Sequence, residues 1–413
     1  MRKYKVCVIV VSQLSYKMHA TEEYYNKINQ LILKILGLWP YQQSYFAGIQ
    51  KVFFISILST FILAQLLLFI TTQYSTNLLL KIFSFVLPIL FCTIKYCFFI
   101  IRADSVKQML ERNRDNWKLL KDKLEIGIIK KYSYFANLFT ISLMCLCCSG
   151  LIIFIIIQFL PLIFDFVLPL NESRSYRLIV ITEYFVNQEK YIYPILFHHI
   201  VAIIVAIIAL CSTSSTFFTY LLQTCALFSI ASYRIENAMK WNILAISSPT
   251  KEHLLYRKIV HAVIVHRRAI EFIKFFTSEF TILFAILIVV GVSSLSLSLF
   301  QFLQLITLMN NITHTMVLAL LIGIHIIYMF DANYAGQIVT DHGMKLFKVT
   351  YNGMWYAAPL QIQKMLLFIM QEGMVDINIR CGGIFAASLE GFATFQYSNS
   401  LLKELKACRT YYI

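Results

Sequence analysis

Two long stretches without charged side chains constrain this chain more than any other feature. Asp, Glu, Lys and Arg are absent from the 43 residues from Tyr191 to Tyr233 and from the 51 residues from Phe280 to Phe330. Because a helix of about 20 residues crosses about 30 Å of hydrocarbon, the second stretch must turn back and cross twice. With 59% hydrophobic and only 14% charged residues, the chain is predicted to be an all-α integral membrane protein.

Seven apolar segments are predicted to span the membrane. They lie at about 52–72, 77–101, 134–160, from 191 onward, 280–300, 311–330 and 381–395. The polar break near Asn310 and Asn311 and the stretch from Gln301 to Leu308 offer the turn between the fifth and sixth. The fourth is long enough for its helix to leave the membrane and continue into a buried assembly. Lys81 and Lys95, in the second, are expected to extend toward the ends of their helix.

The distribution of Lys and Arg predicts which side of the membrane each loop faces. The net charge is +15, with nine basic residues in 102–131 and eight in 234–274, but three in 161–190. The positive-inside rule therefore places the N terminus in the cytoplasm and the C terminus outside, inverted relative to G-protein-coupled receptors. The loop at 161–190 then faces outward, and Asn171 begins a glycosylation acceptor pattern there. Because the basic residues are spread along the whole chain, nucleic acid is not predicted as a partner.

Two further segments are interpreted from helical periodicity. Residues 31–38 form about two apolar turns before Trp39 and are expected to be a helix at the membrane surface. Residues 352–370 are predicted to form an amphipathic helix that is too polar to span the membrane, with one apolar face of Ile362, Met365, Leu366 and Ile369. Residues 1–17 are interpreted as an extension ahead of Met18.

The predicted final span carries one carboxylate, Glu390. An ionisable group in an apolar span is a candidate functional residue because it is costly to place there. Two alternatives stay open. Glu390 either neutralises a basic partner between helices or projects into an ion path, where a ring of carboxylates would favour cations.

No arrangement of residues predicts an enzyme or a cofactor. The histidine pairs at 198–199 and 261/266 have no cysteine or carboxylate partners at metal-ligand spacing. The cysteines at 145, 147 and 148 lie inside an apolar span and are interpreted as packing residues. The Ser and Thr run at 212–216 is expected to form hydrogen bonds within its own helix.

Short motifs at both ends of the chain resemble those of insect odorant receptors. The C-terminal signature is matched by Trp355-Tyr-x-x-Pro359, Gln363-Lys364-x-Leu-Leu-x-x-Met370 and Ser388-Leu-Glu-Gly-Phe-Ala-Thr394. Near the start, Ile35-Leu-Gly-Leu-Trp-Pro-Tyr41 is similar to the family's N-terminal motif in the form common among bees, ants and wasps. The resemblance extends from about residue 24 to 395 and depends on the order and spacing of the motifs together.

The resemblance implies a ligand-tuned odorant receptor subunit rather than the coreceptor. Such a subunit forms an odorant-gated, non-selective cation channel as a hetero-tetramer with an obligate coreceptor. It would bind a small volatile ligand and lie in the plasma membrane of an olfactory neuron dendrite. The implied units are a cytoplasmic segment at 1–51, a six-span ligand-binding region with long cytoplasmic helices at 52–330, a cytoplasmic anchor at 331–380 and a pore-lining span at 381–413.

The same resemblance implies three sets of site residues. Ligand-binding positions in the outer halves of the spans include Phe85, Ile152, Gln158, Tyr193, Phe197, His198 and His314. Subunit contacts involve Trp355, Pro359, Met365 and Ile369. The pore involves Glu390 and a constriction near Leu405, Cys408 and Arg409.

The chain departs from the family pattern after residue 395. Lys403, Lys406 and Arg409 stand where an aliphatic ending is expected. Positive side chains at a constriction would repel cations, so one alternative is a non-conducting variant of the family, and another is an ending that lies outside the pore. A gustatory-type receptor channel is a further alternative, although its span-seven pattern of Thr-Tyr, five apolar residues and Gln-Phe is absent. A transporter is not favoured, because inverted repeats with charged midplane pairs are not seen.

Overall fold

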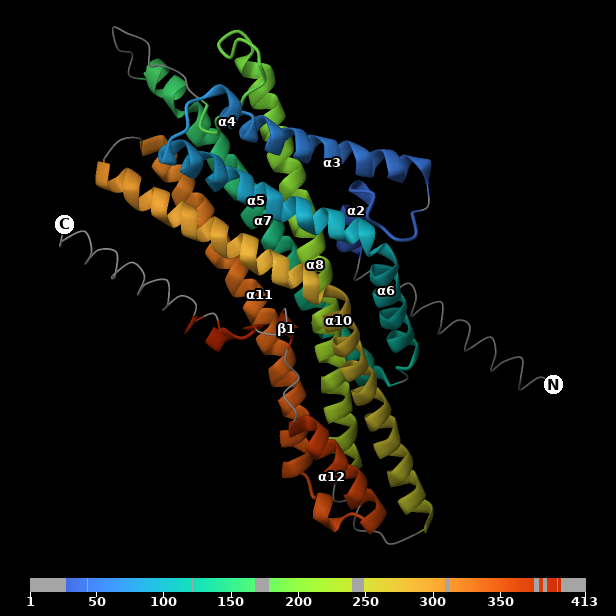
Figure 1. Ribbon diagram of the computed structural model, residues 1–413. Helices are drawn as coiled ribbons and strands as arrows, with labels where there is room; N and C mark the ends of the chain where they lie inside the picture. Colours follow the sequence, from blue (N-terminus) through green and yellow to red (C-terminus); the bar gives the residue numbers. More distant parts are fainter. Residues whose placement is uncertain are drawn as a thin grey trace, which may run out of the picture.

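The structure is a computed structural model that describes residues 27–42, 44–120, 122–167, 178–239, 249–308, 312–374, 379–381, 385–391 and 393–394. Long helices make up most of this part of the chain (Figure 1). The elements are α2 (Lys27–Ile35), α3 (Tyr45–Leu66), α4 (Leu68–Thr71), α5 (Thr76–Ile101), α6 (Ala103–Lys118), α7 (Lys123–Val167), α8 (Ile192–Ala238), α10 (Pro249–Leu308), α11 (Ile312–Asn352), η1 (Trp355–Ala357), α12 (Leu360–Met374), β1 (Arg380–Cys381) and β2 (Phe385–Ala386).

Three helices are far longer than a membrane is thick. Helices α8, α10 and α11 contain 47, 60 and 41 residues. At 1.5 Å per residue they measure about 70, 90 and 60 Å, against about 30 Å of hydrocarbon. All three continue to the end of the molecule where α12 lies (Figure 1). The prediction that the fourth span continues as a helix well beyond the length needed to cross a membrane is confirmed. Helix α10 runs through 301–308, which corrects the prediction that this stretch contributes to the turn before the sixth span, and the predicted turn residues at 310–311 lie outside the described residues.

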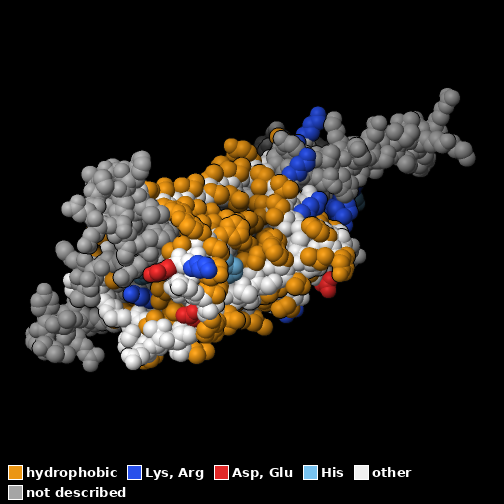
Figure 2. Space-filling model, turned by 90° about the horizontal axis from the view of Figure 1, so that it is seen from above, with side chains coloured by type: hydrophobic (Ala, Val, Ile, Leu, Met, Phe, Trp, Pro, Cys, Tyr) orange, Lys and Arg blue, Asp and Glu red, His pale blue; other side chains and the backbone are white. Residues whose placement is uncertain are grey.

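Six helices in the described part of the chain are long and apolar enough to cross a membrane. They are α3 with α4, α5, α7, α8, α10 and α11, which match the first six predicted spans. Large apolar side chains are exposed along them, among them Val52 on α3 and Ile153 on α7. Figure 2 shows apolar side chains over much of the described surface seen from above. An apolar exterior is the pattern of a helical bundle whose solvent is lipid.

The core is organised around α8. This helix packs against α3, α5, α7, α10 and α11. Nearly every residue of α8 from Cys211 to Ile235 is buried, and many of them are Ala, Ser or Thr. Small residues let neighbouring helices approach closely, which is how helices pack when lipid supplies no hydrophobic force between them.

One face of the α2 segment is part of this core. Leu33 and Leu36 are buried, and the Tyr96 hydroxyl donates to the Leu36 carbonyl at 2.8 Å. The Asn29 amide donates to Thr219 on α8 at 2.7 Å and accepts from Thr140 on α7 at 3.2 Å. One face of the two apolar turns therefore packs inside the chain, whereas Leu31 and Ile35 on the other face are 60% and 46% exposed, and the position of this helix at the membrane surface stays a prediction.

A glycine ends the α2 segment. Gly37 follows α2 with a φ of +69°. This left-handed conformation strains any residue with a Cβ, and a Cβ here would also meet the Ala47 carbonyl oxygen at 2.9 Å. The glycine of the N-terminal motif is thus explained by the backbone turn that brings the chain from α2 to α3.

The structure changes several predicted boundaries. Helix α7 continues to Val167, into the predicted loop at 161–190, and α11 runs unbroken to Asn352, through the predicted unit boundary at 330. The amphipathic helix begins at Leu360, after the 3₁₀ turn η1, and ends at Met374. Its predicted apolar face is confirmed in part, since Ile362, Leu366 and Ile369 are at most 2% exposed.

The predicted seventh span does not begin as a helix at Cys381. Residues 380–381 and 385–386 instead pair as two short antiparallel strands. Ala387 continues this hairpin by donating its amide to the Ile379 carbonyl at 3.0 Å. Helical structure starts only at Leu389 and is described as far as Thr394. Glycines at 382–383 and at 391 are poor helix formers, which is consistent with the late start.

One buried ion pair joins α7 to α8. Arg234 donates from Nε to Glu125 Oε1 at 2.6 Å and from Nη2 to Oε2 at 2.8 Å. The side chains are 16% and 7% exposed. We expect Glu125→Ala to lower the free energy of unfolding by about 3–5 kcal/mol, because it leaves a buried guanidinium without its partner. Denaturant titration of the detergent-solubilised protein measures this change.

The matched control is Glu271→Ala on α10. Glu271 pairs with Arg267 at 2.8 Å, but these side chains are 49% and 78% exposed. An exposed pair at this spacing contributes about 0.3–0.5 kcal/mol, so the control is expected to change stability little. Equal losses in the two variants would contradict a special contribution from the buried pair.

Candidate ligand cavity

An apolar cavity lies between five of the membrane-spanning helices. Its volume is about 410 Å³, and α5, α7, α8, α10 and α11 contribute its walls. Gly150 and Gly291 are among the lining residues, and most of the others are aliphatic or aromatic. Cavities of about 300–1,000 Å³ with mainly apolar walls are the usual sites for small ligands.

The segment before α8 covers one end of this cavity. Val180 lines the cavity, and the Ile179 amide donates to Gln158 on α7 at 3.2 Å. Tyr184 donates to His198 Nδ1 at 2.7 Å, and His198 Nε2 lies 3.2 Å from the Thr60 hydroxyl. Burial raises the pKa of Tyr184 to about 12, so its hydroxyl keeps its proton at neutral pH. These bonds fasten the cover to α3, α7 and α8.

The predicted ligand-binding residues occupy three kinds of position. Phe85 lines the cavity, and His314 packs edge-on against Phe85 with ring centroids 5.8 Å apart. Gln158 and His198 hold the cover. Three residues are outside the cavity on the exterior of the chain, namely Ile152, Tyr193 and Phe197, which are 57%, 71% and 70% exposed. The resemblance predicts how deep in the membrane a residue lies. It does not predict which way the side chain points, because this depends on the rotation of each helix about its own axis.

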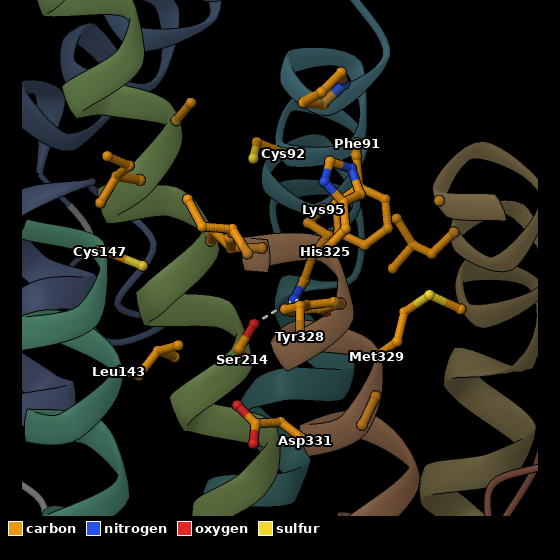
Figure 3. Close-up of a pocket in the computed structure, with 18 of the residues that line it drawn as sticks. Phe91, Cys92, Lys95, Leu143, Cys147, Ser214, His325, Tyr328, Met329 and Asp331 are labelled. Atoms are coloured by element: carbon orange, nitrogen blue, oxygen red, sulfur yellow. Dashed lines mark hydrogen bonds between the residues drawn. The ribbon is translucent and has the colours of Figure 1, made fainter. Parts of the chain in front are cut away.

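The most polar feature of the cavity was not among the predicted site residues. Lys95 on α5 is 1% exposed, which corrects the expectation that it extends toward the end of its helix. Its Nζ donates to Ser214 Oγ on α8 at 2.6 Å and to Tyr328 Oη on α11 at 2.8 Å. Figure 3 shows these three side chains converging at the cavity wall. The only signal in the sequence was a lysine inside an apolar span.

The serine partner of Lys95 differs from its neighbours. Ser212, Thr213, Ser215 and Thr216 all donate to carbonyls of their own helix, as predicted. Ser214 instead faces the cavity and accepts from Lys95. The three side chains thus tie α5, α8 and α11 together around one ammonium group.

The opposite end of the cavity is closed by the C-terminal hairpin. Ile379 and Ala387 line it there. Gly336 on α11 lies directly against Ala387, and a Cβ at Gly336 would collide with the Ala387 carbonyl. Two α11 side chains also accept from the start of the next helix. Asn333 accepts from the Ser388 amide and Gln337 from the Leu389 amide, both at 3.3 Å.

The predicted subunit contacts and pore residues are described only in part. Ile369 is 2% exposed and packs inside its own chain, and Trp355 and Met365 are half-buried against the same core. Pro359 is half-buried between η1 and α12. Glu390 is exposed. Asn171, Leu405, Cys408 and Arg409 lie outside the described residues.

Fold and cavity together define a multi-pass helical membrane protein with an internal apolar cavity. The chain belongs to the 7tm odorant receptor family, whose model matches residues 71–397. This is a receptor family, and the resemblance seen in the motifs is thereby confirmed. No curated protein matches the sequence.

Solved structures share the fold. The insect olfactory receptor OR5 from Machilis hrabei matches with a TM-score of 0.75 at 15% identity, over 93% of this chain and 97% of that one. The same receptor in complex with eugenol matches with a TM-score of 0.74 at 16% identity, with the same coverage.

The close contact at Gly336 generates a prediction for the C-terminal hairpin. We expect Gly336→Val to push Ala387 off α11 and to break the bonds from the Ser388 and Leu389 amides. Hydrogen–deuterium exchange at these amides should then become faster, because an unbonded amide exchanges more readily. Gly323→Val is the control, since a Cβ at that position of α11 meets no atom within 4 Å. Unchanged exchange in Gly336→Val would show that this contact does not secure the hairpin.

Proposed function

We propose that this protein is the ligand-tuned subunit of an odorant-gated, non-selective cation channel, assembled with a coreceptor. The proposal is based on the apolar cavity between α5, α7, α8, α10 and α11, in a chain of the odorant receptor family. Its size and lining suit a small volatile molecule. A relative of the same fold was solved with eugenol bound, which supports the same class of ligand here.

The proposed orientation places the N terminus and α6 in the cytoplasm and the cover at 178–191 outside. Its support is the concentration of Lys and Arg in 102–131 and 234–274. The cavity would then open toward the extracellular side, where a volatile ligand arrives. The plasma membrane of an olfactory neuron dendrite is the proposed location.

Cavity filling tests the proposed ligand site. Gly291 lines the cavity, and a Cβ there would make only an ordinary contact with Phe91 at 3.5 Å. We expect Gly291→Leu to lower odorant-evoked current at least about tenfold, because the larger side chain occupies ligand space. Whole-cell recording from cells that express the chain with the coreceptor measures the current.

Gly127→Leu on α7 is the control, because Gly127 is outside the cavity and a Cβ there meets no atom within 4 Å. Equal odorant-evoked currents in the wild type and in Gly291→Leu would show that the ligand binds outside this cavity. If the wild type reaches the cell surface with the coreceptor but gives no odorant-evoked current, the alternative of a non-conducting variant is favoured.

The proposed subunit interface includes the outer face of α12. Beside the half-buried Trp355, large apolar side chains are exposed there, with Leu360 at 67% and Phe368 at 60%. Helix α12 lies at the end of the molecule formed by the extensions of α8, α10 and α11 (Figure 1). Exposed aromatic residues on an amphipathic helix are typical anchors of protein interfaces.

The aromatic residues Trp355 of η1 and Phe368 of α12 should respond differently from the buried face of α12 when their side chains are shortened. We expect Trp355→Ala and Phe368→Ala to reduce co-purification with the coreceptor, because each removes an aromatic anchor. Ile369→Ala should instead lower thermal stability, because Ile369 packs inside its own chain. Co-purification that is unchanged by both aromatic substitutions would place the interface elsewhere.

A further inference from the structure

We infer that the cavity is tuned to ligands with a carboxylate head on an apolar body, and that Lys95 is the residue that selects them. The inference rests on the proposed function, because it concerns the same ligand cavity. It depends on the hydrogen-bond donors around Lys95 that form no bond within the described part of the protein itself.

The Lys95 ammonium has one N–H group to spare. An ammonium carries three donors, and Ser214 and Tyr328 accept two of them. The Tyr328 ring also lies near the charge, with 5.1 Å between Nζ and the ring centroid. Both partners are uncharged, and no carboxylate among the described residues forms an ion pair with Lys95. A buried cation whose hydrogen-bond partners are all neutral lacks the negative charge that would balance it.

The two hydroxyls add two further donors. Ser214 and Tyr328 accept from Lys95 through their lone pairs, so each keeps its own O–H proton. The neighbouring hydroxyls of the 212–216 run give their protons to α8 carbonyls, whereas Ser214 gives no such bond. The cluster therefore presents three donors and one positive charge to the cavity. A carboxylate, with two oxygens and a negative charge, is the group that this arrangement complements.

The other polar groups of the cavity wall are already engaged or lie apart. His325 uses both ring nitrogens, with Ser294 at 2.9 Å and the Leu321 carbonyl at 2.7 Å. Asn333 is bonded to the Met329 carbonyl and the Ser388 amide. Asp331 lines the cavity one helical turn after Tyr328, without forming an ion pair with Lys95 (Figure 3). The remaining wall is apolar and suits an aliphatic or aromatic body.

The test compares three molecules of similar size that differ in the head group. Hexanoate, methyl hexanoate and hexan-1-ol compete with the fluorescent apolar probe 1-aminoanthracene for the purified full-length protein in lipid nanodiscs at neutral pH. We expect hexanoate to bind at least about tenfold more tightly than the ester or the alcohol, because only hexanoate supplies a negative charge opposite the ammonium, so that both the donor and the acceptor of the hydrogen bond are charged.

Variants assign the preference to Lys95. Lys95→Met is expected to abolish the preference for hexanoate while the affinity for hexan-1-ol changes less than about threefold. Ser214→Ala and Tyr328→Phe each remove one hydroxyl and should weaken hexanoate binding by about threefold to tenfold. Lys81→Met is the matched control, because Lys81 is an exposed lysine on the same helix and outside the cavity.

Each outcome has a defined meaning. Equal displacement of the probe by all three molecules in the wild type, which needs no variant to fold, overturns the inference and leaves the cavity as a ligand site. A hexanoate preference that persists in Lys95→Met, or that Lys81→Met removes equally, also overturns it. If neither the probe nor any of the three molecules binds, the proposed ligand cavity itself is wrong.

Discussion

The close packing of α8 is the interaction on which the rest of the structure depends. A helix of 47 residues cannot be covered by lipid along its whole length, so its extension must be buried by protein. The α8 run from Cys211 to Ile235 meets this need with small side chains and with hydroxyls that bond to the helix itself. Helices α10 and α11 are also long, and because both pack against α8 they cover its extension.

Polar groups placed between helices specify which helices meet. Asn29 joins α2 to α7 and α8, and the Tyr132 hydroxyl joins α7 to Ser229 on α8 and His342 on α11, at 2.8 and 2.6 Å. The Glu125–Arg234 pair and the Lys95 cluster act in the same way. Inside an apolar bundle an unsatisfied polar group is costly, so each of these contacts disfavours alternative rotations of the helices.

Helix α11 connects the cavity to the C-terminal hairpin. Tyr328 contributes to the Lys95 cluster, and Asn333, Gly336 and Gln337 contact the hairpin and the helix start that follows it. These positions lie within about three turns of one rigid helix. A ligand that shifts α11 would therefore displace both ends of this stretch, which is a direct physical route from an occupied cavity to the end of the chain.

Composition and periodicity alone determined much of this protein. Long apolar runs with few charged residues predicted the six membrane-spanning helices, because lipid disfavours charged side chains whatever the tertiary arrangement. The face of Ile362, Leu366 and Ile369 followed from the helical repeat. Short motifs with their spacing identified the family. Each of these signals is local, so it can be read without knowing which helices become neighbours.

Only the tertiary structure decided where individual side chains point. Lys95 bonds to residues 119 and 233 positions away, and no local pattern records such partners. Helix rotation placed Tyr193 and Phe197 outside the cavity and turned His198 toward its cover. Two short paired strands at 380–381 and 385–386 stand where a helix was predicted, and the adjacent Ala387 packs against Gly336 on α11. Such choices depend on contacts between distant segments, which the folded bundle alone brings together.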